Sequence, residues 1–314
     1  MSERPDQSPI TSPRSERVRK VAALAGRSAR RKQSRFRIEG PQAVRSLLAH
    51  RPDLARSVFV TERAAADHSE LTDLAHEAGV PLHTVDDRIV RAMVREGSAP
   101  EADGTARPGG PADASERPGG DGRAAGAGLL TSPQGVVAVG TLPAADPAAA
   151  LHAVQELPAD GALTVVVLHE VRDPGNVGTL IRTADAAGAD LVLLTRTSAD
   201  PFAPKAVRAA VGSLFHLPVI TGAEIDELLP ALAARGITAA ATSGYAEAEL
   251  FTVELPERLA WILGNEAHGL DEATLAAAPL AVRIPLAGRA ESLNVHTAAT
   301  VCLFETLRRR RAGA

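Results

Sequence analysis

Polar side chains that could do chemistry gather in three stretches of the second half of the chain: NVGTLIR at 176–182, ILGNEAHGL at 262–270 and IPLAGRAESLNVHTAA at 284–299. The first combines Asn176 and Arg182 along a helical pattern. An arginine near the unpaired backbone donors at the start of a helix predicts a site for a phosphate or another anion. A capped helix with a surface arginine would show the same residues, so this stretch alone does not decide between the two.

The other two stretches follow apolar runs in the same way. Glu266 and His268 come directly after a strand pattern, but one Glu and one His do not complete a ligand set. We therefore expect no metal, and expect Glu266 to orient neighbouring groups. Ser292 and Asn294 open a long helix, and only one of them can cap it. The other is left for a ligand, together with Arg289.

The elements that position these stretches are read from six apolar runs after residue 162: LTVVVL, DLVLL, LPVI, ITAAAT, LAWIL and AVRIP. Runs buried on both faces and separated by helical patterns predict a parallel sheet with crossover helices. Ligands of such sheets bind at the carboxyl ends of the strands. We therefore expect the three polar stretches to meet at one edge of the sheet.

The first stretch predicts a helix that begins near Asn176, with Asn176 as its cap. Gly178 and Arg182 are four residues apart and share a face, where the glycine leaves open space above the guanidinium. The spacing of Gly175, Gly178 and Gly188 is not G-x-G-x-x-G, and the chain has no G-x-x-x-x-G-K-[ST]. Both facts argue against dinucleotide and nucleoside triphosphate sites.

The 314 residues, 45% of them hydrophobic, suffice for two domains, each with its own core. We predict a disordered basic arm at 1–35, a small α/β domain at 36–140, a linker at 141–160 and a second α/β domain at 161–314. Residues 97–128 carry no large apolar side chain, so we expect them to form a disordered insertion in the small domain.

Within the small domain, residues 36–94 predict helix, strand, helix, strand and helix, with a short strand at SVFV. QGVVAVG at 134–140 then predicts a closing strand, so that the sheet is completed across the insertion.

Charge is distributed unevenly along the chain. Residues 1–37 hold 11 Lys and Arg against 3 Asp and Glu, a charge of +8 in a chain whose total is −4. A basic, Ser-rich arm predicts nonspecific attraction to phosphates, although a solvated tail would have the same composition.

Cysteine and hydropathy patterns limit the class of protein. The single cysteine, Cys302, cannot form a disulfide within the chain, and we expect it to be a small buried hydrophobe. No apolar run approaches the roughly 20 residues that span a bilayer, and the N-terminus lacks an apolar signal core. We expect a cytoplasmic protein without membrane contact.

Taken together and in order, the three stretches resemble the signature motifs of the SpoU-type (TrmH-like) RNA ribose 2'-O-methyltransferases of the SPOUT superfamily. Residues 36–140 resemble the small ribosomal-protein-like RNA-binding domain that often precedes the catalytic domain. The resemblance implies S-adenosylmethionine as methyl donor, a parallel-sheet α/β domain with a deep trefoil knot, and a homodimer formed through that knotted domain.

The resemblance also implies roles for individual residues. The cofactor pocket would include four residues, which are Gly264, Ile284, Leu293 and Asn294. The residues around the reacting ribose would be Asn176, Arg182, Glu266, Ser292 and Asn294. RNA would contact Arg182, Lys205, Arg208, Ser213 and Arg289, although the middle three of these would equally suit a solvated helix face.

For Arg182, the mechanism proposed for the family implies help with deprotonation of the hydroxyl. A guanidinium has a pKa above about 12, so we prefer phosphate anchoring and alkoxide stabilisation and leave the general base open. His296 has no assigned role, and packing is its expected one.

The resulting prediction is an RNA ribose 2'-O-methyltransferase, and by analogy with the added domain we favour 23S ribosomal RNA over transfer RNA as substrate. One alternative is a non-catalytic RNA-binding or ribosome-assembly protein on the same fold. A second is an unrelated α/β nucleotide-binding enzyme, which the missing phosphate-loop signatures disfavour.

Overall fold

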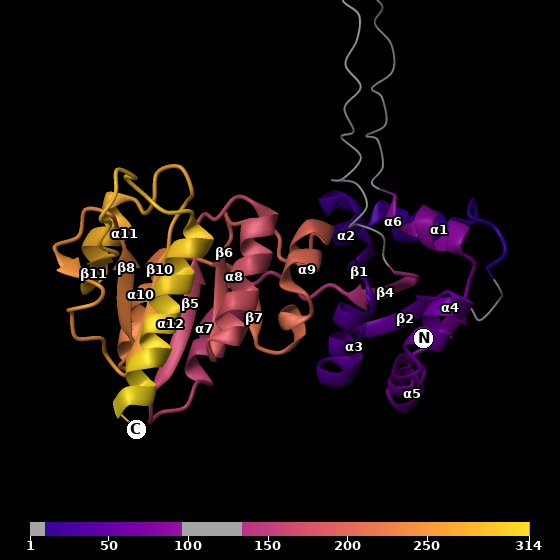
Figure 1. Cartoon of the computed structure of the whole chain (residues 1–314), viewed down its shortest axis with the longest axis horizontal. Coiled ribbons are helices and arrows are strands. Elements are labelled where there is room, and N and C mark those ends of the chain that lie inside the picture. The colour runs from indigo at the N-terminus through magenta and orange to yellow at the C-terminus, as the bar shows by residue number, and fades with distance from the viewer. Residues whose placement is uncertain (1–9, 96–133, 314) are drawn as a thin grey trace, which may run out of the picture.

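The computed structural model describes residues 10–95 and 134–313, which form two α/β domains side by side (Figure 1). The predicted insertion at 97–128 lies outside the described residues. The first domain contains a four-stranded sheet in the order β1-β4-β2-β3, and the second contains a seven-stranded sheet in the order β7-β6-β5-β10-β8-β11-β9. No helix of the described ranges is long and apolar enough to cross a bilayer.

The small sheet combines antiparallel and parallel pairs. Its strands are β1 (Arg35–Glu39), β2 (Ala55–Val60), β3 (Leu82–Thr84) and β4 (Val136–Thr141). β4 pairs antiparallel with both β1 and β2, while β2 and β3 are parallel. QGVVAVG therefore completes the sheet across the insertion, as predicted, but as a central strand. Its helices are α3 (Pro41–His50), the 3-10 turn η1 (Pro52–Leu54), α4 (Glu62–Asp67), α5 (Glu70–Glu77) and α6 (Asp87–Val94).

The strand β1 was not predicted, because charged residues hide its buried character. Arg37 is fully buried and donates from Nε to Glu39 Oε1 at 2.8 Å and from Nη1 to the Met93 carbonyl at 2.5 Å. A buried arginine is tolerated only where its donors find partners of this kind. RFRIE does alternate polar and apolar residues, but the burial of Arg37 and Glu39 on its polar face cannot be read from that pattern.

The expectation of a disordered arm at 1–35 is wrong for its described part. Residues Glu16–Ala23 form α1 and residues Arg27–Gln33 form α2. Val18, Val21 and Leu24 are buried in a cluster with Ile89 and Met93 of α6. Residues 1–9 lie outside the described ranges. The basic segment thus folds because a hydrophobic stripe in α1 meets one on α6, which composition alone does not reveal.

The large sheet is parallel throughout, as predicted. Its strands are β5 (Leu163–Leu168), β6 (Leu191–Thr195), β7 (Val219–Ala223), β8 (Thr238–Thr242), β9 (Ala248–Glu249), β10 (Arg258–Leu263) and β11 (Leu280–Arg283). Six of them match the six apolar runs, and only the two-residue β9 was missed. All residues of β5 are buried, which confirms that helices cover both faces.

Helices pack on the two faces of this sheet in separate apolar clusters. One face holds α8 (Pro174–Ala186), α9 (Pro204–Ala210), the 3-10 turn η2 (Ser213–Phe215) and α12 (Val295–Gly313), and α12 crosses in front of the strands in Figure 1. The other face holds α7 (Pro147–Gln155), α10 (Ile225–Ala234) and α11 (Glu272–Ala277). The predicted linker at 141–160 is therefore wrong over α7, whose Ala150 and Val154 are buried in this second core.

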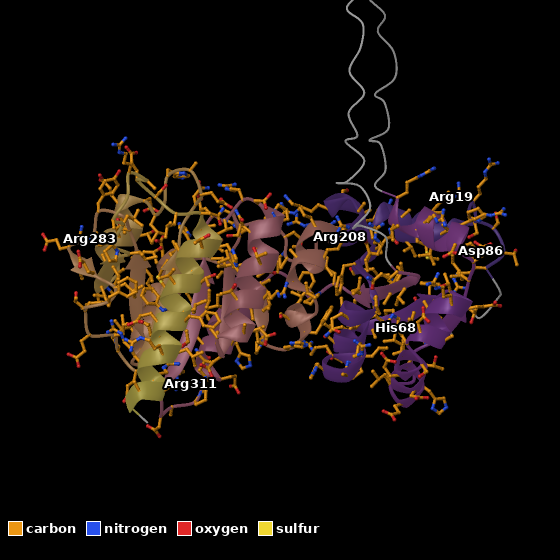
Figure 2. The ribbon with its side chains drawn as sticks, in the orientation of Figure 1. Arg19, His68, Asp86, Arg208, Arg283 and Arg311 are labelled. Atoms are coloured by element: carbon orange, nitrogen blue, oxygen red, sulfur yellow. The ribbon has the colours of Figure 1, made fainter. Side chains whose placement is uncertain are left out.

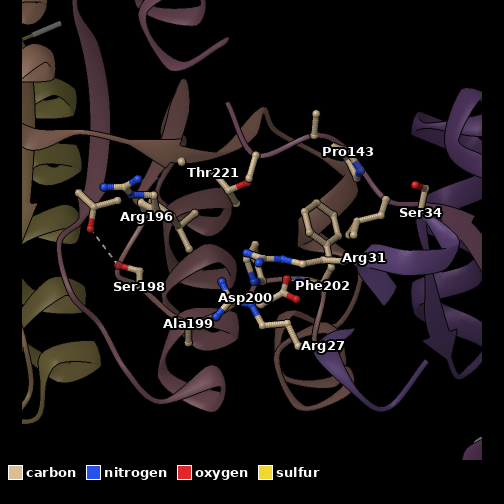
Figure 3. A pocket seen from close by; sticks show the side chains of 17 residues that line it. Arg27, Arg31, Ser34, Pro143, Arg196, Ser198, Ala199, Asp200, Phe202 and Thr221 are labelled. Carbon is tan, nitrogen blue, oxygen red and sulfur yellow. Dashed lines mark hydrogen bonds between the residues drawn. The ribbon is translucent and has the colours of Figure 1, made fainter. Parts of the chain in front are cut away.

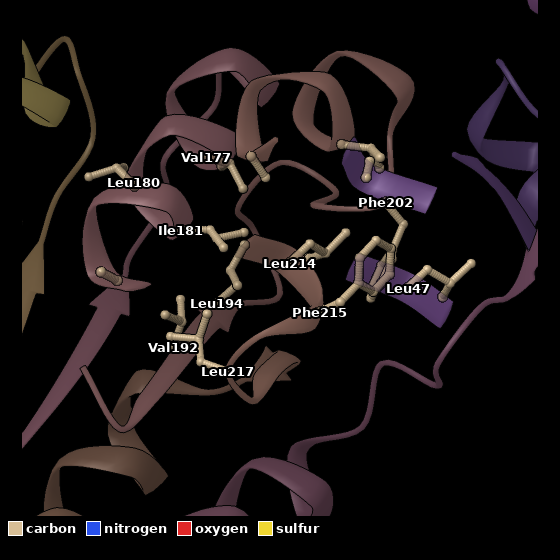
Figure 4. Packing of buried hydrophobic residues seen from close by; sticks show 14 of the residues in the cluster. Leu47, Val177, Leu180, Ile181, Val192, Leu194, Phe202, Leu214, Phe215 and Leu217 are labelled. Atoms are coloured by element: carbon tan, nitrogen blue, oxygen red, sulfur yellow. The ribbon is translucent and has the colours of Figure 1, made fainter. Parts of the chain in front are cut away.

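The core of the large domain continues into the small one. Phe36 of β1 meets Phe202 at 4.9 Å between ring centroids in an edge-to-face pair, and Phe215 of η2 stacks at 6.3 Å. Figure 4 shows Phe202, Phe215 and Leu47 of α3 in this shared cluster. Aromatic pairs of this geometry stabilise by about 0.5–1.5 kcal/mol beyond the area they bury.

Candidate functional site

The three polar stretches follow β5, β10 and β11. These strands are parallel members of one sheet, so their carboxyl ends lie at the same edge. Contacts between the loops confirm that two of the stretches meet there. The hydrogen bonds around Glu266 are the clearest example.

The Glu266 carboxylate accepts three hydrogen bonds from the loop after β5. Oε2 accepts the Arg172 N–H at 3.1 Å, and Oε1 accepts the Asp173 N–H at 3.2 Å and the Asn176 side-chain amide at 3.0 Å. Partial burial by itself would raise the pKa of Glu266, but these hydrogen bonds outweigh it and hold the pKa below its usual value. A carboxylate kept ionised with its oxygens occupied is suited to orienting a loop.

The expectation that Asn176 caps α8 is wrong. Asp173 is the cap: its Oδ1 accepts the Asn176 backbone N–H at 2.9 Å, and Pro174 stands at the first helical position. Proline there loses no hydrogen bond and its fixed φ suits a helix start, so the Asp-Pro pair sets the boundary. The Asn176 side chain is thereby left to bind Glu266.

Asp173 also binds Lys205 of α9. Lys205 Nζ lies 2.5 Å from Asp173 Oδ2, and this hydrogen bond, more than any other contact, lowers the pKa of Asp173. Burial partly opposes this lowering of the pKa, and the hydrogen bond from the Asn176 backbone N–H adds to it. Lys205 remains 60% exposed, so its ammonium stands at the rim of the candidate site.

Arg182 lies on α8 with an exposed side chain, and it makes no hydrogen bond or ion pair with the residues the structure describes. The space above Gly178, however, is not open. A Cβ at Gly178 would lie 2.2 Å from the Ala206 carbonyl oxygen and 2.7 Å from Ala209 Cβ. The glycine is required because α9 packs directly on α8 there, which corrects the expectation of free space beside the guanidinium.

In the third stretch, the structure shows which residue caps α12. Asn294 Oδ1 accepts the His296 backbone N–H at 2.9 Å, so Asn294 is the cap and Ser292 is left exposed in the preceding loop. His296 Nε2 lies 3.0 Å from Thr183 Oγ1 and ties α12 to α8, the packing role expected of it. Cys302 is buried as predicted, and burial raises the pKa of its thiol to about 12.

The predicted cofactor residues lie at the same edge. Gly264 is buried at the end of β10, where Asn265 and Gly269 exchange backbone hydrogen bonds of 3.0 and 2.9 Å and close a short turn. Ile284 and Leu293 are half-buried at the two ends of the loop between β11 and α12. Arg289 is exposed in the same loop.

Two predicted RNA contacts lie elsewhere, at the junction of the domains. Arg208 binds Glu39 of the small domain at 3.1 Å, and Figure 2 shows it between the two domains. Ser213 is 6% exposed in η2, next to α3. These positions hold the domains together, whatever else they contact.

Two side chains at the carboxyl edge were given no role from the sequence. Asn265 Nδ2 donates to the Glu170 carbonyl at 3.0 Å and so also links the loops after β5 and β10. His169 directly follows β5, and its Nε2 lies 3.4 Å from Asp271 Oδ2. Their place just after strands was the available signal. Within the described ranges no group of three His, Cys, Asp or Glu side chains could hold a metal ion.

Two family models match this arrangement, in which a small α/β domain precedes a parallel α/β domain with three polar loops at one edge of its sheet. Residues 163–304 match the SpoU rRNA Methylase family and residues 37–99 match the RNA 2'-O ribose methyltransferase substrate-binding domain. Both domains of the chain are thus similar to the corresponding domains of SpoU methylases.

Curated relatives match part of the chain. The RlmP 23S rRNA (guanosine(2553)-2'-O)-methyltransferase of Bacillus subtilis is 41% identical over 140 residues, which is 45% of this chain and 56% of that protein. The 23S rRNA (uridine(2479)-2'-O)-methyltransferase of Streptomyces viridochromogenes is 34% identical over 187 residues, which is 58% of this chain and 63% of that protein. The matches thus span between 56% and 63% of the length of these two relatives.

Solved structures match nearly the whole chain. An AdoMet-bound rRNA methyltransferase from Sinorhizobium meliloti has a TM-score of 0.73 and 25% identity over 96% of this chain and 98% of that one. The SpoU methyltransferase AviRb from Streptomyces viridochromogenes, in complex with AdoMet, has a TM-score of 0.69 and 26% identity over 96% of this chain and 100% of that one. The two-domain fold is therefore that of SpoU methyltransferases.

Proposed function

We propose that this protein transfers a methyl group from S-adenosylmethionine to a ribose 2'-hydroxyl of structured RNA, and that the RNA is 23S ribosomal RNA. The observation that carries the proposal is the junction of the first two motifs, where Asn176 and the backbone of 172–173 bind Glu266. Relatives named as 23S rRNA 2'-O-methyltransferases, and AdoMet-bound neighbours of the same fold, support it.

The residues at the sheet edge fit the methyl donor. Half-buried Ile284 and Leu293 offer apolar surface to an adenine, and the turn at Gly264 and the loop ending at Asn294 offer uncharged backbone groups. Such a set suits a nucleoside without a triphosphate. When bound, S-adenosylmethionine supplies an electrophilic methyl group on a sulfonium, and Gly264, Ile284, Leu293 and Asn294 would hold it.

The chain's own groups would align and stabilise the ribose. A guanidinium offers only donors, so Arg182 would donate hydrogen bonds to a phosphate or to the oxygen that loses its proton. Glu266 and Asn176 keep the loop before α8 in place, and the exposed Ser292 hydroxyl lies beside the cap of α12. Alignment of the hydroxyl with the methyl group would supply much of the rate.

The RNA would contact the exposed cations at this edge, Arg182, Lys205 and Arg289. For Arg208 and Ser213, RNA contact stays a prediction, because their positions already serve the junction of the domains. A ribosomal RNA substrate would place the protein in the cytoplasm.

A homodimer through the second domain, and a trefoil knot in the loops after β10 and β11, are further parts of the proposal. Phe304 on α12 is 43% exposed, and Phe251 beside β9 is 52% exposed. Exposed aromatic side chains on one domain are suited to an interface. Light scattering after size exclusion tests the dimer, and a monomeric mass would refute it.

The function is tested with purified protein, tritiated-methyl S-adenosylmethionine and transcripts of 23S rRNA, 16S rRNA and transfer RNA. Label should enter 23S rRNA and leave one phosphodiester resistant to alkali, because a 2'-O-methyl group removes the attacking hydroxyl. If label entered transfer RNA alone, transfer RNA and not 23S rRNA would be the substrate. Binding of RNA with no calorimetric binding of S-adenosylmethionine would favour the non-catalytic alternative.

A further inference from the structure

A cavity of about 290 Å³ lies at the junction of the two domains, apart from the candidate methyl-transfer site. Its walls come from α2, the segment 142–145, the carboxyl end of β6 with the following loop, and β7. Figure 3 shows this space with the side chains that line it.

Arginine side chains make the cavity basic. Arg27 and Arg31 are exposed, lie four residues apart and so share one face of α2. Neither makes a side-chain hydrogen bond or ion pair with any residue in 10–95 or 134–313. Figure 3 shows both reaching from α2 into the cavity. Arg196 adds a third guanidinium, which lies 2.9 Å from Glu224 and remains 73% exposed.

The carboxylate in the cavity wall, Asp200, does not cancel this charge. Asp200 Oδ2 accepts from Arg30 Nε at 3.1 Å and from Arg30 Nη2 at 2.7 Å, and Arg30 is 2% exposed. Its other oxygen accepts the Phe202 backbone N–H at 2.8 Å. The guanidiniums of Arg27 and Arg31 are therefore left without a counter-charge, in a chain whose residues outside 1–37 carry a net negative charge.

The cavity is connected to the first motif. Thr195 Oγ1, in its wall, accepts the Glu170 N–H at 3.2 Å, and Ala199 N–H donates to the Val171 carbonyl at 2.8 Å. β6 is also the strand next to β5. The cavity wall is thus hydrogen-bonded to the loop after β5, which leads into α8 and Asn176.

We propose that this cavity binds a backbone phosphate of the RNA substrate and anchors it beside the methyl-transfer site. Two uncompensated guanidiniums on one helix face match a phosphate oxygen pair, and the hydroxyls of Ser34 and Thr221 line the same space. That the bound phosphate belongs to RNA rests on the proposed function, whereas the positive charge of the cavity does not.

The test compares Arg27→Gln/Arg31→Gln with a matched control, Arg14→Gln/Arg19→Gln, which removes the same charge from exposed positions outside the cavity. Affinity for a 23S rRNA transcript is measured over a range of NaCl concentrations. Each lost phosphate contact should lower the slope of log K against log salt by about 0.7–0.9. Because the two arginines hold one phosphate, we expect a loss of about 0.8 for the cavity variant and no loss for the control.

A second readout separates anchoring from chemistry. The cavity variant should raise KM for the RNA on the order of tenfold, keep kcat at saturating RNA, and bind S-adenosylmethionine with wild-type affinity. Equal salt slopes and equal KM in the wild type and the cavity variant would overturn the anchor and leave the proposed function intact.

Two further outcomes are informative. If the salt slopes of the wild type and the cavity variant differ as expected but the wild type methylates no RNA, the anchor stands and the proposed function fails. If the wild type binds no RNA, both fail. If inorganic phosphate raises the melting temperature of the wild type but not of the cavity variant, while the RNA slopes are equal, the cavity takes a free anion and the RNA anchor is refuted.

Discussion

Asn176 donates its side-chain amide to Glu266 at 3.0 Å, and this hydrogen bond joins the loop after β5 to the loop after β10. The donor and acceptor are 90 residues apart in sequence and belong to different motifs. Because Glu266 also holds two backbone N–H groups of the first loop, the pair fixes the start of the helix that carries Arg182. The relationship predicts which substitutions should disturb activity without unfolding the protein.

Asn176→Asp should be more harmful than Asn176→Ala. Aspartate places a second carboxylate beside Glu266, and like charges at hydrogen-bond distance repel and raise a pKa. Alanine only removes one donor and leaves the two backbone donors in place. We expect kcat to fall on the order of 100-fold for the aspartate and less for the alanine. Equal rates for the two variants in the tritium assay would contradict the orienting role of this pair.

Arg182 is tested by its pH-rate profile. Arg182→Ala should lower kcat by roughly 100-fold or more, as the loss of a charged donor to a developing oxyanion does. Arg182→Lys keeps the charge but loses the planar fork, so an intermediate rate is expected. The control is Arg172→Lys at an exposed position, because it keeps the backbone N–H that binds Glu266 and the positive charge that lies 3.4 Å from Glu170. Wild-type activity of Arg182→Lys with an unchanged profile would exclude a bidentate contact.

The Arg30 and Asp200 pair should decide the stability of the domain junction. Arg30 binds Asp200 and also donates to the carbonyls of Leu24 at 3.0 Å and Ala25 at 2.8 Å. Removing one member of a buried pair costs about 3–5 kcal/mol because the partner is left buried and unpaired. We expect Arg30→Gln to lower the free energy of unfolding towards that range in urea titrations, whereas exposed Arg31→Gln should have little effect.

A double-mutant cycle completes that test. Because each single substitution already breaks the ion pair, Arg30→Gln/Asp200→Asn should cost less than the sum of the two single variants. Strict additivity would show that the two side chains do not act as a pair.

The fold of the second domain could be predicted further than that of the first, for a physical reason. A strand such as β5 is buried on both faces and reads as an unbroken apolar run. β1 does not, because the buried Arg37 and Glu39 compensate each other's charge only once the strand is folded. The helix α2 likewise depends on Asp200, 170 residues away from Arg30. Contacts of this range have no local pattern to read.

Within the site, residue types could be predicted better than contacts. Glu266 as an orienting carboxylate and Asn294 as one of two possible caps follow from chemistry and spacing. That Asp173 caps α8 instead of Asn176 was open to prediction, because Pro174 at the first helical position marks the boundary. That Gly178 serves packing depends on where α9 lies.

The close approach of α8 and α9 can be tested through Gly178. An added Cβ would meet the Ala206 carbonyl at 2.2 Å, so the two helices must separate. Overpacking of this kind costs about 1–3 kcal/mol, and we expect Gly178→Ala to lower the melting temperature. Gly244→Ala is the control, because its added Cβ would meet no atom closer than 3.9 Å. Similar melting temperatures for both variants would refute the packing role.

Glu305 on α12 should make stability depend on acid pH. Its carboxylate binds Arg308 and Arg309, each at 2.7 Å, and the hydrogen bond from Arg308 is the main reason why its pKa falls from 4.5 to about 2. A pKa lowered by folding stabilises the protein fully above the unfolded value and loses that contribution as pH falls through the folded one. Glu305→Gln should therefore melt below the wild type at pH 7, and the difference should shrink between pH 4.5 and about pH 2. Exposed Glu272→Gln is the control. A melting difference for Glu305→Gln that stays constant from pH 7 to the acid limit would show that the ion pairs do not stabilise α12.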